Sequence, residues 1–166
     1  MNSITTIDKN IDYREVYKAA VDDAMKKHNE AIEDEMEAYT SITYALSDIT
    51  GDGVCELLIR QSCAKHYIEY WVYGSDGTTS YHMGDFSCDS FDLYGYKSGV
   101  LYLDAYKGDF SLGLAEWTGS DFNNTILYKG TYDRDGDPPT LEDLVSYYDP
   151  SRLLDPIPEF LDMNEW

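Results

Sequence analysis

Between residues 40 and 132 the chain repeats one pattern, in which short runs rich in Tyr, Trp, Val and Leu are separated by turns that contain Gly or Asp. The dipeptide Asp76-Gly77 lies between two such runs, and Asp-Gly between β-rich runs is a strong hairpin signal. No helical periodicity separates the runs, so consecutive strands are expected to pair antiparallel. The sequence therefore predicts an antiparallel meander over residues 40–132, with strands at 43–46, 56–60, 66–73, 79–83, 93–96, 100–106, 110–117 and 125–132.

Residues 11–38, which precede the meander, are predicted to be helical. Apolar residues such as Val16, Ala20 and Ala24 recur at spacings of three and four, and Asp, Glu and Lys fill the other side. The pattern loosens at residues 28–30, where one helix could become two. We interpret the apolar stripe as a side that faces the core rather than a partner.

The C-terminal part of the chain is predicted to begin with a short helix at residues 140–148. Thr140 and Asp143 have the spacing of a capping box, in which each side chain accepts a hydrogen bond from the backbone of the other residue. The acid also complements the positive end of the helix dipole. Pro156 and Pro158 then predict an extended tail.

Length and composition limit the classes of protein to which the chain can belong. A chain of 166 residues with 43% hydrophobic residues is long enough to bury a core and is expected to form one domain, residues 1–166. No window resembles a membrane span, and residues 1–18 lack the apolar segment of a signal peptide. We therefore predict an α+β domain in which an N-terminal helical segment packs on a twisted antiparallel β-meander and a short C-terminal helix follows.

Acidic residues dominate the charge of the chain. There are 32 Asp and Glu residues against 12 Lys and Arg, which gives a net charge of −20. Residues 132–166 alone contain 10 acids and 2 bases. Repulsion on this scale destabilises a compact monomer unless bound cations or a basic partner offset it, although a high charge also serves solubility alone. Phosphate backbones would be repelled, so direct binding of nucleic acid is not expected.

The stretch SDITGDGVCELLI, residues 47–59, places oxygen-bearing side chains at alternate positions directly before an apolar run. A calcium loop needs this spacing because its backbone wraps around one point, and Gly at the sixth position permits the sharp turn. Gly53 occupies that position if the first ligand is Asp48. Carboxylate, hydroxyl and carbonyl oxygens suit calcium better than zinc. The candidate ligands are Asp48, Thr50, Asp52, the carbonyl of Val54, and Glu56.

The same stretch resembles known calcium loops. It is similar to the short DxDGDGxxEL loops of extracellular calcium-blade and dockerin-like modules. More specifically, YALSDITGDGVCELLI, residues 44–59, resembles YALxDIDGDGxPELLI, an element of small secreted or lipid-anchored proteins of gut Firmicutes in which hairpins rich in Tyr and Gly follow. The resemblance extends roughly over residues 40–132, is specific over about sixteen residues, and implies a secreted, calcium-stabilised module. Thr50 departs from the pattern by replacing an acid, and the chain shows no leader.

Two plainer interpretations compete with ion binding. In the first, Asp52-Gly53 simply supplies a positive φ angle to a hairpin turn, and Asp48 bonds its own backbone. The second concerns residues 132–139, which look like another copy of the loop. Pro138 stands where the turning Gly should be, so a solvated acidic loop is the better interpretation there.

Other chemistry has weaker support. Cys63 and His66 could join His82 and Cys88 in a zinc set, but a single Cys-x-x-His pair is a weak signal. The SxxK pattern at residues 62–65 lacks the partners that such enzymes need. Strained nucleophile turns and phosphate-binding Gly loops are not found, and no acid–base pair is fixed by spacing. We therefore predict that the protein is not an enzyme.

The function expected from these features is that of a non-catalytic acidic binding protein that engages a basic protein partner. An inhibitor of a nucleic-acid-handling enzyme, or an immunity protein for a basic toxin, would have such a surface. The odd number of 3 Cys residues favours a reducing, cytoplasmic location. The alternative is a secreted, calcium-stabilised binding module whose strand tyrosines form a platform for a glycan. The residues expected to contact a basic partner are Asp133, Asp135, Asp137, Tyr147 and Tyr148.

Overall fold

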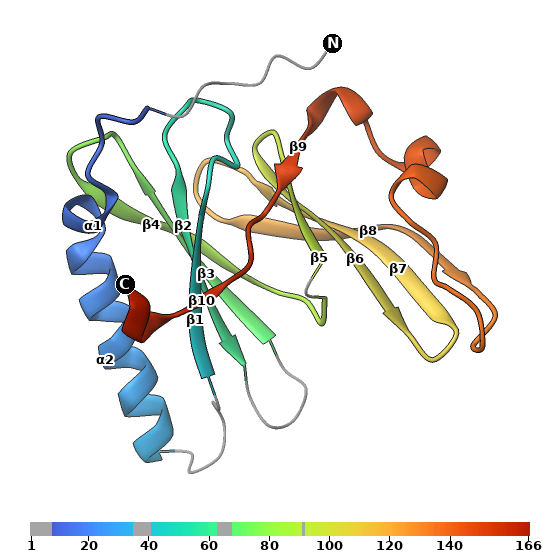
Figure 1. The fold of residues 1–166 in the computed structure, drawn as a ribbon, viewed down its shortest axis with the longest axis horizontal. Helices are drawn as coiled ribbons and strands as arrows, with labels where there is room; N and C mark the ends of the chain where they lie inside the picture. Colours follow the sequence, from blue (N-terminus) through green and yellow to red (C-terminus); the bar gives the residue numbers. More distant parts are fainter. Residues whose placement is uncertain (1–7, 35–40, 63–67, 91) are drawn as a thin grey trace.

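The computed structural model describes residues 8–34, 41–62, 68–90 and 92–166. Within them the chain forms two antiparallel five-stranded sheets and a helical segment, which confirms the α+β class (Figure 1). The strand order is β10-β1-β2-β3-β4 in the first sheet and β8-β7-β6-β5-β9 in the second. The elements are α1 (Tyr13–Val16), α2 (Lys18–Asp34), β1 (Ser41–Ser47), β2 (Glu56–Ser62), β3 (Ile68–Ser75), β4 (Ser80–Ser87), β5 (Asp92–Tyr96), β6 (Gly99–Tyr106), β7 (Asp109–Trp117), β8 (Phe122–Thr131), the 3-10 helices η1 (Glu142–Tyr147) and η2 (Pro150–Arg152), β9 (Leu153–Pro156), β10 (Leu161–Asp162) and the 3-10 helix η3 (Met163–Glu165).

Each sheet has a core on both of its faces, so neighbouring residues of one strand are buried in different cores. Leu57 and Ile59 of β2 pack with the helical segment, whereas Leu58 between them packs between the sheets. In β6, Leu101 lies on the outer face of the second sheet and Tyr102 lies between the sheets. Figure 1 shows α2, the first sheet, the second sheet and η1 in this order from left to right. Because residues on both faces of these strands are buried, the sequences of the central strands contain nearly continuous apolar runs.

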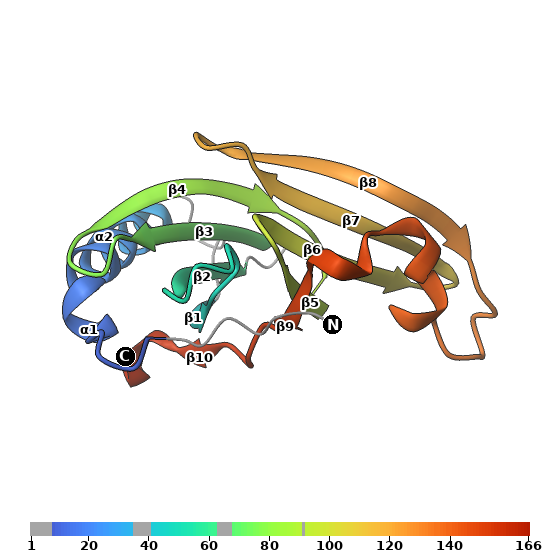
Figure 2. The same cartoon turned by 90° about the horizontal axis from the view of Figure 1, so that it is seen from above.

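The predicted meander is divided into two, because the chain passes from the first sheet to the second between β4 and β5. In the view from above, β3 and β4 continue the arch that β7 and β8 form (Figure 2). The two edge strands are joined where they meet, since Asn124 Nδ2 of β8 donates to the carbonyl of Ser87 in β4 at 2.8 Å. The second sheet is thereby held at a fixed place beside the first.

The helix α2 packs its apolar side on the first sheet, as the sequence predicts. Ala20, Val21 and Ala24 are buried there together with residues of β1, β2 and β3. Residues 35–38, the end of the expected helix, lie outside the described residues. In the described part of the chain, no helix has both the length and the apolar character needed to cross a membrane.

The helical segment is interrupted at Tyr17, whereas the sequence pattern placed the possible break at residues 28–30. The helix α2 runs through those residues without a break. His28 is buried, and its Nδ1 lies 2.6 Å from Oε1 of the fully buried Gln61 in β2. A polar side chain that loosens the apolar pattern is therefore satisfied by a polar partner from the sheet.

The C-terminal segment contains the hydrogen bonds predicted for Thr140 and Asp143, although the N-cap of the helix that follows is Leu141, which makes no side-chain cap. The backbone N–H of Thr140 donates to Asp143 Oδ2 at 2.9 Å, and the N–H of Asp143 donates to Thr140 Oγ1 at 3.4 Å. The helix that follows is the 3-10 helix η1, whose Leu144 is buried against the outer face of the second sheet. The predicted extended tail then pairs with both sheets, β9 with β5 and β10 with β1.

Candidate metal centre and acidic surface

The predicted calcium loop connects β1 to β2, and Asp48 organises its backbone. Asp48 Oδ1 accepts hydrogen bonds from the N–H groups of Gly51 at 2.8 Å and Asp52 at 3.2 Å, and Oδ2 accepts one from Gly53 at 2.9 Å. Gly51 and Gly53 have φ angles of 79° and 91°, which residues with a Cβ rarely adopt. One carboxylate and two glycines therefore wrap the loop around a single point.

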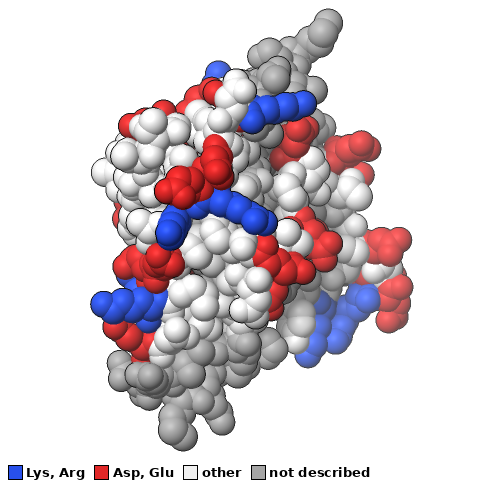
Figure 3. Space-filling model, turned by 60° about the vertical axis from the view of Figure 1, so that its left-hand side comes forward, with Lys and Arg blue, Asp and Glu red and all other residues white. Residues whose placement is uncertain are grey.

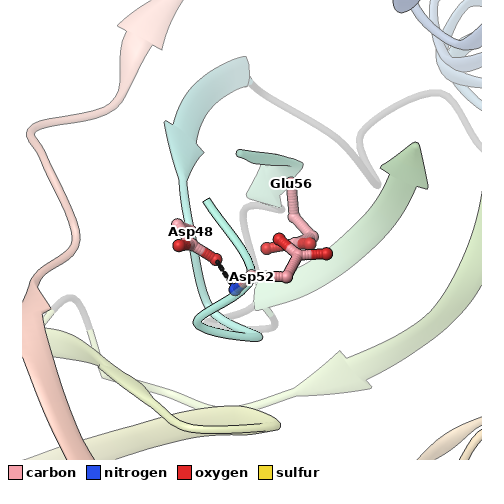
Figure 4. A group of neighbouring side chains, drawn as sticks. All are labelled: Asp48, Asp52 and Glu56. Carbon is pink, nitrogen blue, oxygen red and sulfur yellow. Dashed lines mark hydrogen bonds between the residues drawn. The ribbon is translucent and has the colours of Figure 1, made fainter. Parts of the chain in front are cut away.

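Three carboxylates converge inside this loop, as Figure 4 shows. One oxygen each from Asp48, Asp52 and Glu56 lies within 4.8 Å of the other two. Two oxygens bound to one calcium ion are at most about 5 Å apart, because each lies about 2.3–2.6 Å from the ion. The spacing and the hard oxygen donors therefore fit a single calcium ion. Among the described residues, this is the one group of three or more His, Cys, Asp or Glu with such spacing.

Glu56 is the buried member of this carboxylate cluster, with 3% of its surface exposed. Its Oε2 accepts from the N–H of Ile49 at 2.8 Å, and its Oε1 accepts from the hydroxyl of Thr50 at 3.1 Å. The pKa of Glu56 is raised to about 8, mainly by burial and also by the charges of Asp52 and Asp48, against the lowering effect of the Ile49 N–H. At neutral pH the carboxyl group therefore holds a proton or needs a cation beside it.

The five candidate ligands take different parts in the cluster. The hydroxyl of Thr50 lies between two carboxylates, 3.1 Å from Glu56 Oε1 and 3.4 Å from Asp48 Oδ1. For Val54, the contact described is its N–H, which donates to Asp52 Oδ1 at 2.9 Å. The structure thus brings together the three carboxylates and the hydroxyl that the sequence pattern selected.

The end of the loop is attached to the N-terminal segment by contacts that the sequence analysis missed. The hydroxyl of Tyr13 accepts from the N–H of Cys55 at 3.0 Å, and the hydroxyl of the fully buried Tyr17 donates to the carbonyl of Cys55 at 2.6 Å. The N–H of Asp8 donates to the carbonyl of Gly53 at 2.8 Å. These partners are about forty residues apart in the chain, and local pattern analysis has no signal for such pairs.

The second acidic stretch, residues 132–139, forms an exposed turn. Asp133 Oδ1 accepts from the N–H of Asp135 at 3.0 Å, and the N–H of Gly136 donates to the carbonyl of Asp133 at 2.8 Å. Asp133, Asp135 and Asp137 are all exposed. This geometry agrees with the interpretation of a solvated acidic loop.

The two tyrosines expected to contact a partner have different surroundings. Tyr147 is 41% exposed, and its ring stacks on Tyr128 of β8 with 3.8 Å between ring centroids. Tyr148 is half-buried in the core on the outer face of the second sheet, and its hydroxyl donates to the carbonyl of Leu141 at 3.1 Å. Tyr147 is therefore available to a ligand, while Tyr148 holds η1 to the sheet.

Most strand tyrosines belong to the cores and not to an open platform. Each sheet has a core on both of its faces, and most strand tyrosines are part of one of these cores. Tyr81 and Tyr106 are exposed together with Tyr147. The buried strand tyrosines are Tyr44, Tyr70, Tyr73, Tyr96 and Tyr102.

The zinc set that the sequence supports only weakly falls partly outside the described residues, where Cys63 and His66 lie. His82 Nε2 is 2.7 Å from Asp85 Oδ1, and both side chains are exposed on β4. Cys88 is a buried free thiol. Burial raises the pKa of this thiol to about 12, so Cys88 stays protonated at neutral pH.

The ion pairs among the described residues lie outside the acidic stretch at residues 132–149. On the side that carries α2, Lys and Arg are interspersed with Asp and Glu (Figure 3). The ion pairs found within the described ranges are Lys27–Asp23, His82–Asp85 and Arg152–Glu116. None of them involves an acid of residues 132–149.

Comparison of the chain with protein-family models, with curated proteins and with solved structures gives no match.

Proposed function

We propose that the protein is a non-catalytic binding domain that engages a basic protein partner through residues 132–149, the acidic segment. This segment contains six acids and one base, and all six acids are exposed. Within the described structure none of these acids forms an ion pair. Like charges held together at a surface repel one another, and a partner rich in Lys and Arg removes that repulsion. This exposed, unneutralised charge is the observation that carries the proposal.

Such a partner would bind with an association that is fast and sensitive to salt. The inhibitor or immunity role against a basic enzyme or toxin uses this property, because the acidic protein must reach its target quickly. A cytoplasmic location belongs to this proposal, and direct binding to nucleic acid does not.

Capture experiments at low and high salt test the proposal. The immobilised protein should retain a basic partner at low salt and release it at high salt. A variant with Asp133→Asn, Asp135→Asn and Asp137→Asn should retain less of it. The matched control carries Glu15→Gln, Asp22→Asn and Glu30→Gln, which removes three exposed charges from the helical side. A neutral or acidic partner, or equal retention by both variants, would contradict the proposal.

A second candidate function is a secreted, calcium-stabilised binding module of the kind that the resemblance implies, with a glycan as a possible class of ligand. The convergence of Asp48, Asp52 and Glu56 within 4.8 Å favours it. A calcium ion at this point would stabilise the charged form of buried Glu56 and offset part of the negative charge. This function is compatible with binding of a basic partner, because the loop and the acidic segment are separate parts of the chain.

A further inference from the structure

Three aromatic rings lie in a row on the outer face of the second sheet, and we call Phe110, Tyr128 and Tyr147 the aromatic strip. The ring centroids of Phe110 and Tyr128 are 5.8 Å apart, and Tyr147 stacks on Tyr128 at 3.8 Å with 13° between the ring planes. A Cβ at Gly130 would come within 2.6 Å of Phe110 Cζ, so the absence of a side chain at Gly130 gives this ring its place. The strip combines residues of β7, β8 and η1.

The strip is partly open to solvent and its outer member belongs to the acidic segment. Tyr147 is 41% exposed and Val145 of the same 3-10 helix is 46% exposed, whereas Phe110 and Tyr128 are half-buried on the core below. The acids of the segment flank Tyr147 in the chain on both sides, with Asp143 before it and Asp149 after it. An exposed ring whose neighbours along the chain include exposed carboxylates is complementary to a planar cation.

The molecule contains one internal example of this combination. The guanidinium Cζ of Arg152 lies 4.3 Å from the ring centroid of Tyr96, and Nη2 of the same side chain lies 3.1 Å from Glu116 Oε2. One arginine therefore contacts a ring and a carboxylate at once. Arginine suits this geometry better than lysine, because its guanidinium is planar, weakly hydrated and able to stack, whereas an ammonium group is compact and strongly hydrated.

We propose that the aromatic strip is the docking site for arginine side chains of the basic partner, with a guanidinium stacked on Tyr147 and bound by carboxylates of the acidic segment. The inference rests on the proposed function and adds to it the residue type that is recognised and the place of recognition. Phe110 and Tyr128 enter it as the residues that hold Tyr147 in position.

Labelled hexa-arginine and hexalysine peptides test this inference by fluorescence anisotropy on the full chain. The wild type should bind hexa-arginine more tightly than hexalysine by about two- to fivefold, the preference that one exposed ring contact supplies. Tyr147→Leu keeps an apolar side chain and should remove this preference while leaving hexalysine binding unchanged. Tyr106→Leu is the matched control, since Tyr106 is exposed on another part of the same sheet and already carries Lys107 over its ring. It should keep the preference.

The outcomes separate the two proposals. The docking site would be overturned if the wild type bound both peptides equally, or if Tyr147→Leu kept the preference for hexa-arginine. In either case the proposed function would still stand if the triple Asp→Asn variant bound both peptides more weakly than the wild type. Absence of binding by either peptide at low salt would overturn the proposed function and the docking site together. Circular dichroism of each variant checks that the sheets remain folded.

Discussion

The loop at residues 48–56 and the turn at residues 133–137 are similar in composition and different in structure. In the loop, glycines at positive φ let the backbone bend around Asp48, and β2 carries Glu56 into the core. In the turn, Pro138 follows and the three acids stay exposed. Acidic residues therefore converge where glycine permits the bend and where an adjoining strand takes one carboxylate out of solvent. Acid content alone leaves the charges at the surface.

The largest effect is expected when the organising carboxylate of the loop is removed. Asp48→Ala leaves the N–H groups of Gly51, Asp52 and Gly53 without their acceptor. Hydrogen bonds to a charged group are worth about 1.5–3 kcal/mol each, but water replaces part of the lost contact. We therefore expect the free energy of unfolding to fall by about 2–4 kcal/mol. Asp133→Ala in the turn should change stability little. Urea unfolding of both variants measures the contrast, and equal losses would show that the loop is an ordinary turn.

Calcium should distinguish the two acidic regions by its effect on the melting temperature. Binding to the native state alone stabilises by about 2.7 kcal/mol at a hundredfold excess of free ion over the dissociation constant. For a chain of this size the corresponding rise in Tm is roughly 5–10 °C. Asp52→Ala should abolish the rise, whereas Asp135→Ala should retain it. Identical melting curves of the wild type in calcium and in chelator would remove the second candidate function.

The pH dependence of stability should reveal the buried carboxyl group. The pKa of Glu56 is raised from 4.5 to about 8, so the folded state holds a proton that the unfolded state has lost between these values. Its stabilising contribution is complete below about pH 4.5 and falls as pH rises, by at most about 1.4 kcal/mol per pH unit. In chelator, Glu56→Gln should flatten this decline, and Asp133→Asn should leave it unchanged. A decline of wild-type size in Glu56→Gln would show that Glu56 is not its source.

The sequence predicted the features that depend on local spacing. The strands, the capping box and the convergence of Asp48, Asp52 and Glu56 all follow from residues within one turn or one hairpin. The division into two sheets was not predicted, although apolar runs such as Leu57-Leu58-Ile59 carry its signal, since a strand with one open face alternates with polar residues. The burial of Glu56 was not predicted either, because it depends on the strands that surround this side chain.

Contacts between distant residues were beyond the reach of the sequence pattern. The bond from His28 to Gln61 spans 33 positions, and the stack of Tyr147 on Tyr128 joins a 3-10 helix to a strand. Each of these pairs depends on how the sheets and the covering segments are placed. Tyr148, which the composition of the segment suggested as a contact residue, is instead half-buried on the core formed by residues of β5, β6 and β7, which the local pattern does not reveal.

The smallest expected effect concerns the capping box beside the acidic turn. Thr140→Ala removes one donor and one acceptor from the turn that leads into η1 and should lower Tm by roughly 2–4 °C, the result expected for a loss of about 1 kcal/mol of hydrogen bonding in a chain of this size. The shift should be the same with calcium and with chelator, because the cap lies outside the loop. A shift that depends on calcium would show that the two acidic regions are coupled.

If the exposed acids of residues 132–149 attract a basic partner, the association kinetics of the captured partner will depend on them. Surface plasmon resonance at several salt concentrations gives the association rate, its salt dependence and the dissociation rate for the wild type and for both triple variants. Exposed charges act mainly on the association rate, so the Asp133, Asp135 and Asp137 variant should associate more slowly, with a flatter salt dependence and a less altered dissociation rate. The Glu15, Asp22 and Glu30 variant should behave like the wild type. Equal association rates and equal salt dependence in all three proteins would contradict the account.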